Sequence, residues 1–170
     1  MRYAIALFTI AALATSARAQ GKTRERAPRF ADYPVTKLSR LPVAKPLVPE
    51  SVNEGLRLQL QKGFYDNSRT NFAGRYFLAV TGCGTACAWG AIVYPKTGRT
   101  IVLPTVSGWL DTHGKFRGID FRHSSRLVVL SGERDDKEGD MGRHFYVFED
   151  GKLRFLKTMN TEGNFMVPNR

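Results

Sequence analysis

Short apolar runs bounded by glycine, proline and charged residues fill the second half of the chain. They occupy positions 74–81, 88–94, 99–103, 116–121, 126–131, 143–148 and 152–158. Runs of this length, rich in aromatic and β-branched residues, predict strands rather than helices. Because short strands follow one another with turn signals between them, we expect antiparallel pairing and a mainly β (α+β) fold. The pattern predicts two antiparallel meanders, and it leaves open whether they form one sheet or a small sandwich.

The segments between the runs indicate where the chain turns. Asp150-Gly151 stands between the last two runs and is a strong hairpin signal. Before the first run, Ser51 and Glu54 form a capping box, which predicts a helix over 51–62 that packs on the sheet. The segments 104–115 and 132–142 are expected to be loops.

The first 19 residues have the form of a secretory signal peptide. Arg2 gives a positively charged start, positions 4–14 form an apolar core, and Ala17-Arg18-Ala19 is a small-x-small cleavage site. The apolar core is too short to span a bilayer. We therefore expect cleavage, export to the periplasm and no transmembrane segment in the mature chain. The rest divides into a basic, proline-rich arm over 20–49, a single β-rich domain over 50–158 and a tail over 159–170.

Charge narrows the range of partners. The mature chain would keep 24 basic residues against 15 acidic ones, a net charge of +9. Such a charge favours anionic partners, which in an envelope are lipid head groups, lipopolysaccharide, anionic polymers or acidic proteins. Export argues against nucleic acid. The arm contains seven of the basic residues and five prolines, so we expect it to be extended or disordered, serving as an electrostatic tether or as a solvated linker.

Both cysteines lie in the short connection 82–87 between two predicted strands. If these strands form a hairpin, its loop ends lie within disulfide distance, so we expect a Cys83–Cys87 bridge in an oxidising compartment. A redox pair is a less favoured interpretation, because the spacing is C-x3-C and no helix follows. A papain-like nucleophile would need a distant histidine and asparagine, for which too little chain follows Cys87. No further soft ligands lie nearby, so no metal site and no cofactor are expected there.

Two short stretches supply candidate contact residues. A disulfide-closed loop would present Gly84, Thr85 and Ala86, together with Trp89 on the following strand. The stretch Asn71-Phe72-Ala73-Gly74 predicts a turn with unusual backbone angles, in which Phe72 anchors the turn in the core. Arg75 and Tyr76 follow it, and the functional interpretation adds them to the surface near the cysteine loop.

Other polar groups give weaker indications of chemistry. The acidic stretch 133–140 invites a calcium interpretation, but EF-hand spacing is absent and Arg134 and Lys137 interrupt the acids, so a solvated loop is favoured. His123 with Asp120 and Ser125 suggests a hydrolase only if the fold brings them together. The chain has neither a Gly-x-Ser-x-Gly nor a His-Glu-x-x-His motif. His113 is placed in a loop and His144 on a strand surface.

Two sets of residues carry resemblances. Asn71-Phe-Ala-Gly-Arg-Tyr, then Gly82-Cys-Gly-Thr-Ala-Cys and a strand ending in a Thr-Gly turn, resemble a group of small exported proteobacterial proteins of unknown function. Asp120-Phe-Arg-His-Ser-Ser-Arg-Leu-Val-Val resembles the second half of that group, so the similarity covers about 34–157. The cysteine loop also resembles that of Ivy-type periplasmic lysozyme inhibitors. Its spacing differs by one, however, and it lacks their loop histidine. Lysozymes are usually basic, so a +9 chain would be repelled.

These observations favour a non-enzymatic, periplasmic binding or inhibitor-type module. It would present a disulfide-closed loop to an envelope protein or to an anionic envelope component. The alternative is an envelope hydrolase or redox enzyme of unfamiliar type, so enzymatic activity stays open. No catalytic residue, metal ligand or cofactor is assigned from the sequence.

Overall fold

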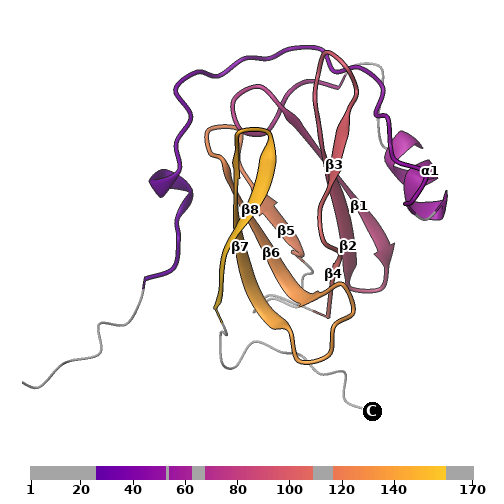
Figure 1. Cartoon of the computed structure of the whole chain (residues 1–170), viewed down its shortest axis with the longest axis vertical. Coiled ribbons are helices and arrows are strands. Elements are labelled where there is room, and N and C mark those ends of the chain that lie inside the picture. Colours follow the sequence, from indigo (N-terminus) through magenta and orange to yellow (C-terminus); the bar gives the residue numbers. More distant parts are fainter. Residues whose placement is uncertain (1–25, 53, 63–67, 109–116, 160–170) are drawn as a thin grey trace, which may run out of the picture.

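The structure is a computed structural model that describes residues 26–52, 54–62, 68–108 and 117–159. Figure 1 shows an architecture made mostly of strands. The elements in chain order are the 3-10 turn η1 (Phe30–Asp32), the helix α1 (Glu54–Lys62) and the strands β1 (Phe77–Gly84), β2 (Cys87–Val93), β3 (Thr100–Val102), β4 (Val106–Ser107), β5 (Ile119–Phe121), β6 (Leu127–Arg134), β7 (Met141–Glu149) and β8 (Lys152–Met159). The expectation of a mainly β, antiparallel fold is confirmed. The expected signal peptide, Trp109, His113 and almost all of the expected tail lie outside the described residues.

All eight strands belong to one sheet. Its main order is β1-β2-β4-β6-β7-β8, with β3 also paired to β2 and β5 also paired to β6. The two meanders are joined through β4, where Ser107 pairs with Cys87 of β2 and also with Glu133 of β6. This two-residue strand lies inside a segment that was expected to be a loop. The choice between one sheet and two is therefore decided by pairing that no local pattern marks.

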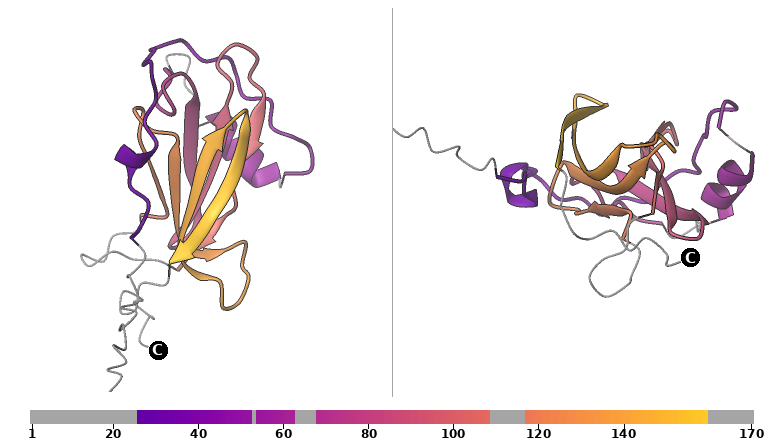
Figure 2. Two further views of the ribbon diagram at one scale, coloured as in Figure 1. Left: turned by 60° about the vertical axis from the view of Figure 1, so that its left-hand side comes forward. Right: turned by 90° about the horizontal axis from the view of Figure 1, so that it is seen from below.

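The sheet is strongly curved, so that its two halves enclose the core (Figure 2). Leu78 and Ile92 of the first meander share one buried cluster with Val128, Leu130 and Tyr146 of the second. The two halves are joined near β4 and are closed at the other end by an aromatic group. Its centre is Phe72, which is fully buried as expected and whose ring centroid lies 6.1 Å from Phe121 and 5.8 Å from Phe148.

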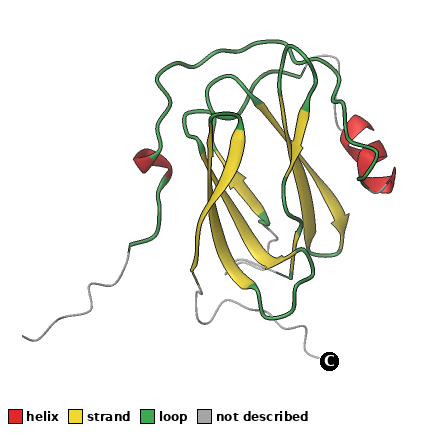
Figure 3. Cartoon of the chain, viewed as in Figure 1, coloured by secondary structure: helices red, strands yellow, loops and turns green. Residues whose placement is uncertain are grey.

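Two smaller clusters cover the outer faces of the sheet. Leu60 of α1 is buried with Ala79, Trp89 and Ala91, beside the first meander, where Figure 3 shows the helix. On the second meander, Phe30 and Tyr33 pack against Leu127, Val129 and Phe145. Segments that precede the sheet in sequence therefore supply part of its hydrophobic covering.

The segment 34–47, which we call the belt, crosses one end of the sheet. Its backbone N–H groups donate to carbonyls of three separate loops: Val35 to Ser124 (3.1 Å), Ser39 to Gly74 (2.7 Å) and Leu47 to Gly98 (2.7 Å). The expected arm is thus extended, as its prolines require, but this part of it is neither free nor disordered. Local composition suggested a linker because the loops that hold the belt are distant in sequence.

Strand ends differ from the expected ones in the second meander. β6 ends only at Arg134 and β7 already begins at Met141, so the expected loop 132–142 is reduced to positions 135–140. β4 passes very close to Gly132, where a Cβ would collide with the Ser107 carbonyl. The absence of a Cβ therefore lets β6 remain paired at this position. At the other end of β7 the Asp150-Gly151 hairpin is confirmed, with φ of +50° and +70° at its two turn residues.

Candidate functional site

The Cys83–Cys87 disulfide closes a tight turn at the end of the first hairpin. The bridge is present as expected, with the two Cα atoms 5.1 Å apart. Pairing of Gly84 with Cys87 leaves only Thr85 and Ala86 in the turn, whereas the sequence suggested a loop over 82–87. A register shift at Cys83 makes this residue a bulge, which increases the local twist of the edge strand. The strands continue into the turn because β4 gives Cys87 a second partner.

Three independent constraints define the shape of this turn. One is the disulfide, and the second is the pairing of Cys87 with Ser107 of β4. The third is a hydrogen bond of 2.8 Å from the Gly108 N–H to the Ala86 carbonyl. Ala86 has a φ of +50°, a left-handed conformation that an alanine adopts only when its surroundings impose it. The turn is therefore preorganised.

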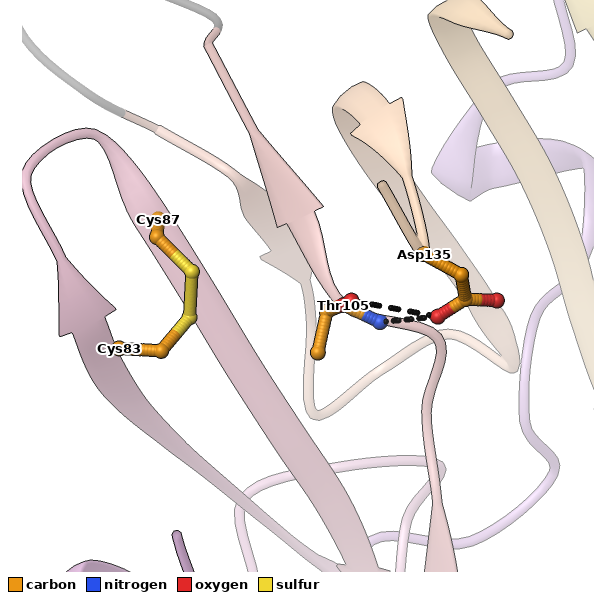
Figure 4. The surroundings of a disulfide bond; sticks show 4 residues. All are labelled: Cys83, Cys87, Thr105 and Asp135. Carbon is orange, nitrogen blue, oxygen red and sulfur yellow. Dashed lines mark hydrogen bonds between the residues drawn. A yellow bond between two sulfur atoms is a disulfide. The ribbon is translucent and has the colours of Figure 1, made fainter. Parts of the chain in front are cut away.

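A second loop is held beside the turn by the start of β4. Thr105 donates from its backbone N–H (2.9 Å) and its hydroxyl (3.2 Å) to one carboxylate oxygen of Asp135, as Figure 4 shows. In return, the Asp135 N–H donates to the Thr105 carbonyl at 3.0 Å. This clasp fixes the β6–β7 loop next to the β4 segment that also pairs with the turn. No local pattern in the sequence marks Thr105 and Asp135 as partners at this end of the molecule.

The β6–β7 loop makes this end locally acidic. Five of the 15 acidic residues of the chain lie between positions 133 and 140, against two basic residues there, Arg134 and Lys137. Arg134 is neutralised by Asp140, with Nε 2.8 Å from a carboxylate oxygen. Asp136 and Glu138 are exposed. The stretch 133–140 therefore carries a local net charge of −3, although the chain as a whole is strongly basic.

The turn residues themselves divide by exposure. Gly84 and Thr85 are exposed and Ala86 is partly exposed, so all three can meet a partner. Trp89 is only 1 % exposed and packs in the cluster with Leu60 and Ala91. The expectation that Trp89 is a contact is wrong, because its side chain points to the helix-covered face and is sealed there.

Arg75 and Tyr76 lie far from the turn. They precede β1, whereas the turn follows it, and a strand of eight residues is about 27 Å long. Tyr76 belongs to the aromatic group at the belt end, with its ring centroid 4.8 Å from that of Phe148. The expectation that these two residues share a surface with the cysteine loop is therefore wrong. Nearness in sequence misled because a whole strand separates the two sites.

Two of the three residues considered for hydrolysis, Ser125 and His123, have structural partners. Ser125 Oγ lies 2.9 Å from the Phe30 carbonyl and 3.0 Å from the Tyr33 carbonyl, and it accepts the Leu127 N–H at 3.1 Å. His123 Nε2 lies 3.0 Å from the Gly74 carbonyl. Within the described part of the chain, no hydrogen bond joins Asp120, His123 and Ser125 to one another. A shallow, open depression lined by Arg26, Tyr33 and Lys157 includes none of the three.

His144 was expected on a strand surface and is in fact fully buried. Its Nε2 donates to the Gly132 carbonyl at 2.9 Å, so that Nδ1 accepts from the Thr158 hydroxyl at 2.8 Å. The imidazole thus joins β6, β7 and β8 across the sheet. The expectation failed because a histidine between polar and apolar neighbours gives no sign of which face of the strand is covered.

Arg134 also connects the acidic loop to the second meander. Its guanidinium donates to the Tyr146 hydroxyl (2.5 Å) and stacks over the Phe155 ring. Burial acts to lower the pKa of Arg134, but the hydrogen bonds to Tyr146 and Asp140 outweigh it and raise the pKa. Burial raises the pKa of the Tyr146 phenol, and the nearby guanidinium only partly offsets this. The arginine is therefore a fixed structural cation.

Neither a metal cluster nor a membrane-spanning helix is found among the described residues. Within residues 26–52, 54–62, 68–108 and 117–159, no three His, Cys, Asp or Glu side chains gather as a metal site requires. In the same ranges no helix has the length and hydropathy needed to cross a membrane. Comparison with protein-family models, curated proteins and solved structures finds no match.

Proposed function

We propose that this protein is an exported, non-enzymatic binding module that presents the Cys83–Cys87 turn to a protein partner. The observation that carries the proposal is the preorganisation of an exposed turn by a disulfide, by β4 and by the Gly108–Ala86 hydrogen bond. A loop that is already ordered loses little conformational entropy on binding, so more of its contact energy appears as affinity. Gly84, Thr85 and Ala86 are the proposed contacts. In this proposal the helix expected over 51–62 covers the face of the sheet opposite the core and leaves the turn free.

The acidic loop beside the turn supports a partner with a positively charged surface. Asp136 and Glu138 are exposed on this loop with the exposed Lys137 between them, so a partner that meets the turn also lies near a loop of net negative charge. A positively charged protein surface fits this end, because complementary charge accelerates encounter and like charge suppresses it. This reverses the conclusion drawn from net charge alone. The +9 of the mature chain is not spread evenly, and charges farther away than about 10 Å are largely screened at 0.1 M salt.

The test is capture from an envelope extract by tagged residues 20–170, at low and high salt, with mass spectrometry of what is retained. Thr85→Asp places a bulky charge on the turn and is expected to abolish capture of the specific partner. Thr97→Asp is the matched control, since Thr97 is another exposed turn threonine at the opposite end of the sheet. If both variants retain the same proteins as the wild type, the turn is not the binding surface.

A second pair of variants tests the sign of the partner. Asp136 and Asp150 are both exposed aspartates with positive φ, at +53° and +50°, and asparagine tolerates that conformation. Asp136→Asn is expected to slow association about severalfold in low salt, while Asp150→Asn leaves it unchanged. Faster association of Asp136→Asn would contradict a basic partner.

A further inference from the structure

The belt exposes large apolar side chains in an unusual concentration. Leu38 is 56 % exposed, Leu41 38 % and Leu47 66 %. Six large apolar side chains are exposed among the described residues, and these three of them lie within ten positions of one another on the belt. Half of the exposed large apolar side chains among the described residues therefore lie on this one segment, and apolar surface exposed together is typical of interaction sites.

Basic side chains alternate with these leucines. Lys37, Arg40 and Lys45 are all exposed, and the belt contains no acidic residue. The loops under the belt add exposed Arg69 and Arg99, whose backbones form bridges with Pro42 and Leu47 of the belt. The belt end of the molecule is therefore both apolar and strongly positive.

Two glycines hold the belt in the position that exposes these side chains. Gly74 and Gly98 both have positive φ, of +75° and +72°. A Cβ on Gly74 would collide with the Lys37 carbonyl, and one on Gly98 with the Lys45 carbonyl. Thr100 also donates to the Leu47 carbonyl at 2.8 Å. The backbone of the belt thus lies flat against the loops, while its leucine and basic side chains face outwards.

We propose that the belt is a docking surface for an anionic phospholipid bilayer. Basic side chains near such a surface are attracted to the head groups, and apolar side chains beside them enter the boundary between head groups and acyl chains. A soluble polyanion would use the bases but would leave the leucines in water, so the combination favours a membrane. The acidic loop lies at the opposite end of strands about 27 Å long, a distance at which its repulsion of the bilayer is largely screened by salt.

This docking would point the Cys83–Cys87 turn away from the bilayer. The belt crosses the end at which β1 begins, and the turn lies where β1 ends (Figure 1). The two surfaces are separate, so the proposal for one can be refuted while the proposal for the other still holds. Thr85→Asp, which is expected to abolish partner capture, is expected to leave vesicle binding unchanged.

The experiment is flotation of residues 20–170 with vesicles of phosphatidylcholine alone and of phosphatidylcholine mixed with phosphatidylglycerol. Binding is expected only to the anionic vesicles. Lys37→Gln with Arg40→Gln should weaken it roughly thirtyfold, since each lost charge corresponds to about fivefold. The control is Arg57→Gln with Lys137→Gln, which lowers the net charge by the same amount off the belt.

The leucines separate membrane docking from plain electrostatic binding. Leu38→Ala and Leu47→Ala should each weaken vesicle binding roughly fivefold, because about half of each side chain is free to leave water. Leu58→Ala is the matched control, since Leu58 is 44 % exposed but lies on α1. Thermal unfolding of each variant shows whether the fold is retained.

Two outcomes would overturn the proposal. If the control charge pair weakens binding as much as the belt pair, net charge alone binds and the belt is not the site. If the belt charge pair fails to bind while Leu38→Ala and Leu47→Ala bind like the wild type, the surface serves a soluble polyanion instead. The proposal requires weaker binding by the belt charge pair and by both belt leucine variants. It also requires unchanged binding by the control charge pair, by Leu58→Ala and by Thr85→Asp.

Discussion

Reduction of the Cys83–Cys87 bridge is expected to destabilise the protein by a small and calculable amount. A disulfide stabilises mainly by restricting the unfolded chain, and the effect grows with the length of the ring. The two cysteines are only four positions apart. The loop-entropy relation gives about 2 kcal/mol for so short a ring at 25 °C. The folded turn should change little, because β4 and the Gly108–Ala86 hydrogen bond also hold it.

Urea unfolding of the oxidised and the reduced protein measures this quantity directly. The midpoint should shift, while the slope stays nearly constant because so small a ring hardly changes the surface exposed on unfolding. The double variant Cys83→Ala with Cys87→Ala serves as a second comparison. It should lose slightly more than the reduced protein does, since Cys83 also packs against the cluster that contains Leu60 and Trp89.

Two results would refute this reasoning. A loss of about 4 kcal/mol or more belongs to rings of roughly 45 residues or longer, so it would mean that the bridge supports the sheet well beyond the turn. No measurable loss would mean that the unfolded chain is already restricted there without the bridge. In either case the contribution of the bridge to the rigidity of the turn would have to be revised before the role of the turn in partner binding is interpreted.

Three further substitutions test the packing of the second meander and the closed end of the core. Phe72→Ala should lower the free energy of unfolding by about 3–5 kcal/mol in urea, since the buried ring would leave a cavity, and an equal loss for an exposed site such as Phe155→Ala would contradict this. Thr158→Val should cost about 1 kcal/mol because it removes the donor to His144 Nδ1, and no loss would mean that this hydrogen bond contributes nothing net. The raised pKa of Tyr146 means that the unfolded chain loses the proton first, so wild-type stability should fall as pH rises above about 10, and Tyr146→Phe should show less of this fall.

The apolar pattern was sufficient for the strands, because alternation and turn chemistry are local properties of the chain. The run 143–148 lies within β7, all but the first residue of the run 126–131 lies within β6, and Asp150-Gly151 forms the expected hairpin. The cysteine spacing likewise predicted the bridge, because residues four positions apart at the end of a hairpin lie within disulfide distance of each other. These features depend on neighbours within about ten residues along the chain.

The candidate surfaces could not be predicted from local sequence patterns, because they are made by contacts between segments that are distant in sequence. The sequence of 133–140 shows an acidic loop, but only the clasp between Thr105 and Asp135 places it next to the cysteine turn. Trp89 and His144 lie on strands, and each has a ring with an N–H group that could face either solvent or the interior. Packing against Leu60 of the helix buries Trp89, and the neighbouring strand that carries Thr158 covers His144.

By itself, the sequence determined the antiparallel strands, the two hairpins, the disulfide and a proline-rich segment that cannot be helical. The tertiary structure alone decided that β4 joins the meanders into one sheet and that the proline-rich segment becomes a belt with its leucines outwards. It also decided that opposite charges gather at opposite ends. The physical reason is that periodicity and turn chemistry act between near neighbours, whereas exposure and local charge depend on which distant segments finally meet.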